Sequence, residues 1–186
     1  SDFDKPGYLL FITKNGMAKK SELGLYKATR YSKPLVALNL KGNDEVVDIH
    51  LTDGSSTVFL ATSHGYGLMF KEEDVPVIGA RAAGVKGINL KDDDFVVSGK
   101  VFTEDSSSMI ALVMHGGAVK KMKRSEFELG TRAKRGVVML RELKKNPHKV
   151  VGIELLDDMD QLVIESEKGK MEEISSFQLR PSDRYS

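Results

Sequence analysis

The chain has no cysteine and no tryptophan, and its longest uninterrupted apolar stretch is the short segment MIALVM at residues 109–114. Without cysteine there can be no disulfide and no thiolate chemistry. A helix that crosses a bilayer needs about 20 mostly apolar residues, so the sequence predicts no membrane span and no membrane partner. The N-terminal SDFDKPGY lacks the basic start and apolar stretch of a secretory signal. These absences favour a cytoplasmic protein.

A pattern of about 50 residues occurs four times along the chain. Each copy opens with an apolar run that ends at a glycine-containing turn, at Gly16, Gly65, Gly116 and Gly169. A short apolar strand and a valine pair follow in the first three copies, as VKGINL and FVVSG show for the second copy. The sequence therefore predicts a single repeat-built domain with copies at about 1–53, 54–105, 106–157 and 158–186, the last one incomplete.

The apolar segments are short, rich in Val, Ile, Leu and Phe, and bounded by turn residues, which favours strands over helices. Asn15 and Gly16 are expected to supply the positive backbone angles of a tight hairpin turn. Four short strands per copy predict an all-β fold, an array of four-stranded antiparallel blades of the β-propeller or β-pinwheel type. A closed propeller takes four to eight blades, so this array is expected to be open or incomplete. It is a fragment of a longer array, or its N-terminal segment is shared around a ring, or its blades form an open arc, and the fragment is the favoured alternative.

Basic and acidic residues are segregated, although the chain carries 28 of the former and 27 of the latter. Basic residues concentrate between positions 116 and 149, and an arginine recurs after each hairpin, at Arg30, Arg81, Arg132 and then Arg180 or Arg184. Arginines at one structural position would form a row suited to a phosphate backbone. A solvated basic face is the plain alternative. The predicted DNA-binding residues are Arg30, Lys33, Arg81, Lys86, Lys120, Lys121, Lys123, Arg124, Arg132, Lys134 and Arg135.

Motifs that would indicate catalysis are weak. GARAAGVKG at residues 79–87 lacks the Lys-Ser/Thr pair of a phosphate-binding loop, which favours a glycine-rich loop that leads into a strand. The four histidines show no metal-ligand spacing. Acidic runs such as Asp92 to Asp94 have no histidine or lysine partner to tune them and are interpreted as solvated turn residues. We therefore predict no catalytic, cofactor or metal site in this domain.

The hairpin sequence GYLLFITKNGMAKKSEL and the passages GARAAGVKGINL and GTRAKRGVVML resemble the C-terminal domain of the A subunit of bacterial type IIA topoisomerases, over essentially the whole chain. Gyrase members of this family carry a QRRGGKG-type box in the first blade. Here the corresponding segment, residues 27–38, reads KATRYSKPLVAL, and TRAKRG at residues 131–136 is the nearest approach. The chain thus resembles the topoisomerase IV branch more than gyrase, and a gyrase fragment without its first blade is the alternative.

This resemblance implies a domain that binds and bends double-stranded DNA without sequence preference and positions the transported segment for ATP-dependent decatenation and supercoil relaxation. It implies that the catalytic tyrosine lies outside this chain, that ATP and magnesium serve the parent enzyme, and that the domain is nucleoid-associated. The implied protein partners are the ATPase B subunit and the N-terminal cleavage core of the polypeptide that carries this domain. The rival from another class is a protein-interaction propeller, which would show an exposed apolar or aromatic patch. An enzyme in its own right would need a converging polar cluster that the sequence does not offer.

Overall fold

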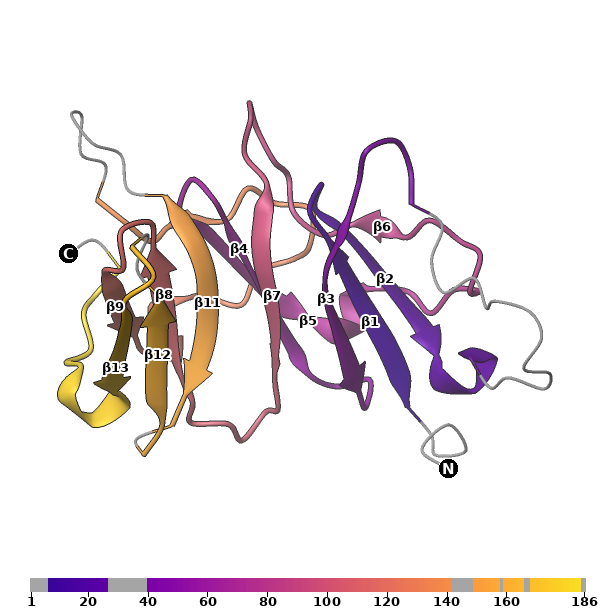
Figure 1. The fold of residues 1–186 in the computed structure, drawn as a ribbon. Coiled ribbons are helices and arrows are strands. Elements are labelled where there is room, and N and C mark those ends of the chain that lie inside the picture. Colours follow the sequence, from indigo (N-terminus) through magenta and orange to yellow (C-terminus); the bar gives the residue numbers. More distant parts are fainter. Residues whose placement is uncertain (1–6, 27–39, 142–148, 158, 166–167, 185–186) are drawn as a thin grey trace.

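The computed structural model describes residues 7–26, 40–141, 149–157, 159–165 and 168–184. This part of the chain folds into antiparallel β-sheets that follow one another along an open arc, with the two ends of the chain at opposite ends of the arc (Figure 1). It contains no helix of the length and apolar character that a membrane crossing requires. The predicted all-β array of antiparallel blades is confirmed.

Each copy begins with a β-hairpin that is followed by a short 3-10 helix. These hairpins and helices are β1 (Tyr8–Thr13), β2 (Met17–Glu22) and η2 (Leu23–Tyr26); β4 (Thr57–Thr62), β5 (Tyr66–Lys71) and η3 (Glu72–Asp74); β8 (Met109–Met114), β9 (Val119–Met122) and η4 (Arg124–Glu126); and β12 (Gln161–Glu165), β13 (Met171–Ser175) and η5 (Ser176–Gln178). The later strands of the copies are β3 (Val46–Thr52), β6 (Val85–Lys86), β7 (Val96–Phe102), β10 (Val137–Val138) and β11 (Val150–Leu156). The predicted LVALNL strand of the first copy falls largely outside the described residues.

The sheets do not coincide with the sequence copies. Their strand orders are β3-β1-β2-β6, β10-β5-β4-β7, β11-β8-β9 and β12-β13. Strand β6 of the second copy pairs with β2 of the first, and β10 of the third copy pairs with β5 of the second. The second and third copies do contain four strands each, as predicted, but each four-stranded sheet combines three strands of one copy with one strand of the next. Periodicity reports the repeating unit, whereas it cannot report which neighbour an edge strand joins.

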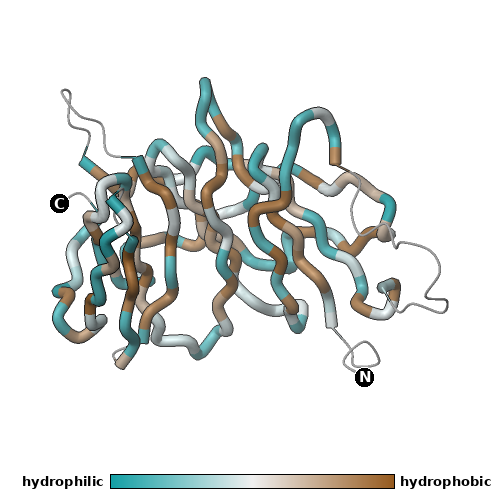
Figure 2. The backbone as a smooth tube through the Cα atoms, viewed as in Figure 1, coloured by the Kyte–Doolittle hydropathy of each residue, from teal (hydrophilic) through white to brown (hydrophobic). Residues whose placement is uncertain are grey.

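Successive sheets pack face to face, and the core lies between them. Alternate residues of β4 point to opposite faces, so Val58 and Leu60 pack against the first sheet while Phe59 faces the third. Phe59 meets Phe127 edge to face, with ring centroids 4.9 Å apart. In Figure 2 apolar residues are concentrated along the strands and hydrophilic residues along many of the turns. A strand such as β4 therefore has no solvent face.

The hairpin turns depend on glycine at one position. Gly16 and Gly65 have φ angles of 85° and 87°, but Asn15 is not among the residues with positive φ. The expectation that Asn15 and Gly16 both adopt positive angles is therefore wrong for Asn15. In the third copy both Gly116 and Gly117 have positive φ, and the N–H of Gly117 closes the turn as that of Gly65 does. The glycine equivalent to Gly65 is thus Gly117, one residue beyond the predicted position.

A second glycine starts each exchanged strand. Gly84 precedes β6 with φ of 94°, and Gly136 precedes β10 with φ of 87°. A Cβ at Gly84 would lie 2.7 Å from the backbone oxygen of Ala18, and one at Gly136 would overlap that of Gly67. Only glycine permits both the backbone angle and this approach to the neighbouring strand. The prediction that the 79–87 loop leads into a strand is confirmed.

Candidate nucleic-acid interface

The predicted DNA-binding residues fall into groups of very different exposure. Arg30 and Lys33 lie outside the described residues. Lys120 and Lys121 are buried, and Arg124, Arg132 and Arg135 are partly buried. The exposed members are Arg81, Lys86, Lys123 and Lys134.

The adjacent lysines of β9 are buried between the third and fourth copies. Lys120 is 8% exposed, and its Nζ donates to the backbone oxygens of Met139 at 2.9 Å and Arg184 at 3.0 Å. Lys121 is 4% exposed and donates to the backbone oxygen of Ser176 at 2.7 Å. Burial lowers the pKa of Lys120. The prediction that these two lysines belong to the exposed basic surface is wrong, because their strand is enclosed between neighbouring copies.

The first copy contains an equivalent buried pair. Lys19 donates to the backbone oxygen of Ala80, and Lys20 donates to that of Glu72 at 3.1 Å. The Lys20 ammonium also lies 3.6 Å from the fully buried Glu72 carboxylate, which accepts a hydrogen bond from the Thr52 hydroxyl at 2.8 Å. In both places a lysine pair on the second hairpin strand joins one copy to the loop of the next. The repeated Lys-Lys pairs in MAKKSE and VKKMKR were the signal for this role.

Arg132 ties the third copy to the second. Its Nε donates to the backbone oxygen of Asp74 at 2.9 Å and its Nη1 to that of Lys86 at 3.0 Å. Arg184 repeats the second bond in the fourth copy, where its Nη1 donates to the backbone oxygen of Val138 at 3.2 Å. In the second copy this position is held by an alanine, and the exposed Arg81 lies one residue later. The prediction that Arg81 and Arg132 share a structural position is therefore wrong.

Arg124 packs between the second and third copies. Its Nη1 donates to the backbone oxygen of Thr103 at 3.0 Å, and its Nη2 donates to the hydroxyl of Thr57 at 2.9 Å. The guanidinium also stacks over Phe102, with its carbon 4.8 Å from the ring centroid. These three contacts hold the side chain against the protein. Arg124 is better described as a structural contact than as part of an open basic surface.

Arg135 pairs with a buried acid. Its guanidinium carbon lies 3.9 Å from the Tyr66 ring centroid, and its Nη1 is 3.4 Å from Oδ2 of Asp94. The other carboxylate oxygen of Asp94 accepts hydrogen bonds from the backbone N–H groups of His64 and Phe95. Asp94 is only 7% exposed, so the interpretation of Asp92 to Asp94 as solvated turn residues is wrong for this residue.

Three exposed cations, Arg81, Lys86 and Lys134, which we call the rim cations, lie on the loops that carry the exchanged strands. The loop of the third copy packs along the segment around β6, because the N–H of Asn89 donates to the oxygen of Lys134 at 2.8 Å. A second bond runs from the N–H of Ala133 to the oxygen of Gly87 at 2.7 Å. Within the described part of the chain none of the three rim cations forms an ion pair.

The rim cations belong to one edge of the array. Strands β3, β7 and β11 contact one another along the arc, whereas β6 and β10 lie at the opposite end of their sheets (Figure 1). We call the edge formed by β6 and β10 the outer edge. The three rim cations reach solvent there, and none of them has an acidic partner among the described residues. This edge therefore presents exposed cations from two different copies.

Other exposed basic residues, among them Lys71 and Arg141, were not predicted as site residues. Lys71 at the end of β5 holds the position in its copy that Lys123 holds after β9, and both are exposed. Arg141 is exposed a few residues beyond β10. Aligning the copies on their 3-10 helices would have revealed the repeated Lys71 and Lys123. An alignment based on the arginines alone does not show that Lys71 and Lys123 are equivalent, because Arg81 and Arg132 differ by one residue in their positions within the copies.

Some of the exposed apolar side chains lie at the two ends of the array. Ile49 and Leu51 of β3 are 54% and 62% exposed, and Val163 and Phe177 near the last hairpin are 55% and 82% exposed. In the interior of the array, equivalent strand positions are covered by the neighbouring sheet. These four residues mark sheet faces, whereas Val77 beside β2 and Val137 of β10, which are 45% and 39% exposed, lie at the outer edge. Within the described ranges no group of three or more histidine, aspartate or glutamate side chains could hold a metal ion.

Comparison with known proteins agrees with this repeat architecture. The family described as "DNA gyrase C-terminal domain, beta-propeller" matches residues 7–53, 56–103 and 115–157. The chain belongs to this family. The A subunit of DNA topoisomerase 4 from Bacillus subtilis (strain 168) is 60% identical over 185 residues, which cover 100% of this chain and 23% of that protein. The corresponding protein of Staphylococcus aureus (strain MRSA252) is 37% identical over 150 residues, covering 81% of this chain and 18% of that protein.

Solved structures separate the two branches of the family. The crystal structure of the C-terminal domain of DNA topoisomerase IV matches with a TM-score of 0.95 and 54% identity, covering 100% of this chain and 57% of the other. The DNA gyrase A C-terminal domain matches with a TM-score of 0.85 and 20% identity, covering 98% and 60%. The second match shows the fold alone. The predicted likeness to topoisomerase IV rather than gyrase is confirmed.

Proposed function

We propose that this chain binds double-stranded DNA through the rim cations of its outer edge, without reading its sequence. The supporting observation is that Lys86 and Lys134, from different copies, are exposed and held in neighbouring segments by the Asn89 and Arg132 hydrogen bonds. Lysine and arginine contacts to phosphates neutralise charge and release counterions whatever the base sequence. The backbone oxygens of Lys86 and Lys134 accept these hydrogen bonds, which hold the two residues in place while their side-chain ammonium groups stay exposed to solvent. Such an arrangement suits contacts with phosphates.

The arc of sheets gives this surface a curvature. DNA that follows successive outer-edge loops has to bend, and smooth bending of a 20–30 bp segment by 40–90° costs on the order of 1–6 kcal/mol. Additional phosphate contacts along the arc would offset that cost. The domain would therefore hold a duplex in a bent path.

In the parent protein this bent segment would be the one transported. The domain would present it to the N-terminal cleavage core of the same polypeptide, while the ATPase B subunit supplies the energy for decatenation and supercoil relaxation. Support for this role comes from the family and from relatives named as the A subunit of topoisomerase 4. The chain spans about a quarter of the length of the B. subtilis relative, at 23%. Its own part would be mechanical, at the nucleoid.

The experiment is a fluorescence anisotropy titration of mixed-sequence duplexes across a range of salt concentrations. We expect affinity to fall steeply and linearly on logarithmic axes, with similar values for unrelated sequences. Lys86→Glu with Lys134→Glu should weaken binding at least several-fold and lower the salt slope by about 2, because each phosphate contact contributes about 1.

The matched control reverses two exposed lysines on turns of other copies, Lys41→Glu with Lys168→Glu, for the same change in net charge. This control should leave the salt slope nearly unchanged. Equal losses in the two double variants would show that only overall charge matters and that the outer edge is not the site. Absence of binding at low salt would refute the proposal for this chain.

A further inference from the structure

Arg135 differs from the other two partly buried arginines of the third copy. Arg124 and Arg132 each donate two hydrogen bonds to groups of the second copy. A guanidinium carries five N–H donors, yet that of Arg135 forms no hydrogen bond within the described residues, and its Nη1 is buried. Arg135 thus lacks an acceptor where comparable arginines have one.

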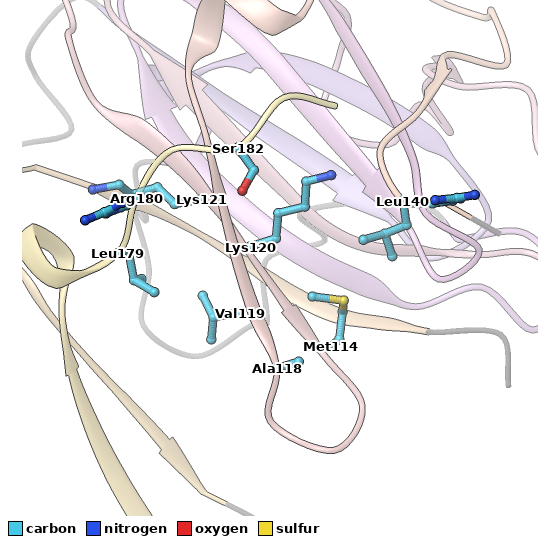
Figure 3. A pocket seen from close by; sticks show the side chains of 10 residues that line it. Met114, Ala118, Val119, Lys120, Lys121, Leu140, Leu179, Arg180 and Ser182 are labelled. Carbon is cyan, nitrogen blue, oxygen red and sulfur yellow. The ribbon is translucent and has the colours of Figure 1, made fainter. Parts of the chain in front are cut away.

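The buried lysines of the third copy are also hydrogen-bonded. Lys120 and Lys121 line a groove beside Ser182, as Figure 3 shows. Their ammonium groups donate to the backbone oxygens of Met139 at 2.9 Å and of Ser176 at 2.7 Å. Cations withdrawn from solvent in this copy are therefore paired with oxygens of the protein, and Arg135 is the exception among the described residues.

Tyr66 and Asp94 hold the Arg135 guanidinium in place. Its carbon lies 3.9 Å from the Tyr66 ring centroid, and its Nη1 lies 3.4 Å from Oδ2 of Asp94. The other carboxylate oxygen of Asp94 accepts from the backbone N–H groups of His64 at 3.0 Å and Phe95 at 2.9 Å, which fixes the acid in its turn. The charge of Arg135 is thus positioned before a ligand arrives.

The remaining donors of Arg135 are open. Nη1 is the one nitrogen of this side chain that is buried without a hydrogen bond, so Nε and Nη2, which form none either, reach solvent. In the chain Arg135 follows the rim cation Lys134 and precedes Gly136, which leads into β10 at the outer edge. A planar guanidinium stacked on an aromatic ring suits a phosphate, to which it can donate two parallel hydrogen bonds.

The turn before β3 in the first copy shows that its acid does not need an arginine. Asp44 accepts hydrogen bonds from two backbone N–H groups of its turn, at 2.9 and 2.8 Å, as Asp94 does. The residue at the place of Arg135 in the second copy is Ala83. Pairing of the turn acid with an arginine is therefore an addition at the joint between the second and third copies.

We propose that Arg135 binds one DNA phosphate at the outer edge and that Asp94 and Tyr66 are its positioning residues. This inference rests on the proposed function and adds to the rim cations a contact of another kind. A phosphate supplies the acceptors that the guanidinium lacks. Because the Asp94 side chain is fully buried, it acts by ordering Arg135 in advance, which lowers the entropy that binding has to remove. An acidic residue thus supports binding of a polyanion.

The test is the anisotropy titration across salt concentrations. Arg135→Ala should weaken binding several-fold and lower the salt slope by about 1. Asp94→Asn keeps an oxygen for the turn and removes the charge beside Arg135, so we expect a lower slope although the net charge becomes more positive. The matched control, Asp44→Asn, makes the same change in the equivalent turn. It should bind at least as tightly as wild type, with an unchanged slope.

Further variants separate positioning from folding. Tyr66→Leu removes the stacked ring and should lower the slope, whereas Tyr66→Phe keeps the ring and should not. In the Arg135→Ala background, Asp94→Asn should not lower the slope further, because it acts through that arginine. Calorimetric Tm values confirm that each variant is folded at the temperature of the titration.

The failure of this inference differs from that of the proposed function. If wild type binds with a steep salt slope and Arg135→Ala leaves it unchanged, the inference is wrong while the proposed function stands. Asp94→Asn binding as Asp44→Asn does would overturn the positioning role. A slope raised by Asp94→Asn only where Arg135 is present would also overturn it, since the acid would then withhold the arginine from DNA. No binding by wild type would refute the proposed function and this inference together.

Discussion

Arg132 donates from its Nη1 to the backbone oxygen of Lys86 at 3.0 Å. A partly buried arginine of the third copy thus holds strand β6 of the second copy, and β6 carries the exposed Lys86 side chain. The two residues were predicted to act alike, as phosphate contacts. Their roles are complementary, because the hydrogen-bonded arginine positions the backbone and the exposed lysine is left for a ligand. This division of labour between cations separates mutations that affect folding from mutations that affect binding.

Replacing Arg132 with alanine should destabilise the fold. Two backbone oxygens, of Asp74 and Lys86, would lose their donor, which costs about 1–3 kcal/mol in the free energy of unfolding. Arg81→Ala, at an exposed position, should change that free energy by no more than about 0.5 kcal/mol. Urea denaturation measures both. An Arg132→Ala variant as stable as Arg81→Ala would show that these bonds contribute little.

Glu72 should be among the most sensitive polar positions. Its carboxylate is fully buried beside Lys20 and accepts from the Thr52 hydroxyl, so Glu72→Ala leaves a buried ammonium without its partner. We expect a loss of about 3–5 kcal/mol. Combining Glu72→Leu with Lys20→Met should cost less than the sum of the single changes, as a double-mutant cycle by urea denaturation would reveal. Strict additivity would mean that the pair is not coupled.

Gly136→Ala should disrupt the exchanged strand. The residue has φ of 87°, and an added Cβ would overlap the backbone oxygen of Gly67. Gly169 provides the control, since it has φ of 75° with open space around it. Gly169→Ala should cost about 1–2 kcal/mol from the backbone angle alone, and Gly136→Ala clearly more. Calorimetric Tm values of the two variants give the comparison, and equal losses would argue against the close approach of β10 to β5.

Lys120 should make the free energy of unfolding increase as the pH is raised into the alkaline range. Burial lowers the pKa of Lys120 in the folded state below the ordinary value of 10.5, which the unfolded chain keeps. At a pH between the folded-state pKa and the unfolded-state pKa, the folded state therefore binds fewer protons than the unfolded state. The free energy of unfolding then increases with pH in that window. The measurement compares wild type with Lys120→Met in urea at pH 8 and pH 10.5. The difference should move in favour of wild type at the higher pH, and a constant difference would contradict the assignment.

Sequence patterns were sufficient for the repeat, the strands and the family. The glycine-led hairpins and the VKGINL passage indicated where strands form, because turn glycines and β-branched runs act locally. The pairing of β6 with β2 could not be predicted, since a two-residue strand carries no information about its neighbour. That choice is made by contacts such as Arg132 to Lys86, which join residues far apart in the sequence.

The basic surface was predicted less well than the fold, for a physical reason. A lysine in an alternating strand usually marks a solvent face, but most residues of β2 and β9 are buried, and the lysines of each strand are covered by the loop of the next copy. Lys19, Lys20, Lys120 and Lys121 therefore bind backbone oxygens inside the array. Lys86 in the short strand β6 and Lys134 in the loop before β10 are exposed, whereas Arg132 and Arg135 of that same loop are partly buried.

Because β6 and β10 each join the sheet of the preceding copy, the sequence copy and the four-stranded sheet differ by one strand. Excising an interior copy at its sequence boundaries would take a strand from the sheet before it and deprive its own sheet of the strand that comes after. Gain or loss of a copy at an end of the array changes one strand exchange between neighbouring copies. Replacement of an interior copy changes two, one with the copy before it and one with the copy after it. Because β6 lies between β5 and β7 in the chain, an end point that completes the first sheet leaves the second without β7 and β10, and one that completes the second leaves the third without β11. No end point chosen within the second or third copy therefore keeps every remaining sheet whole.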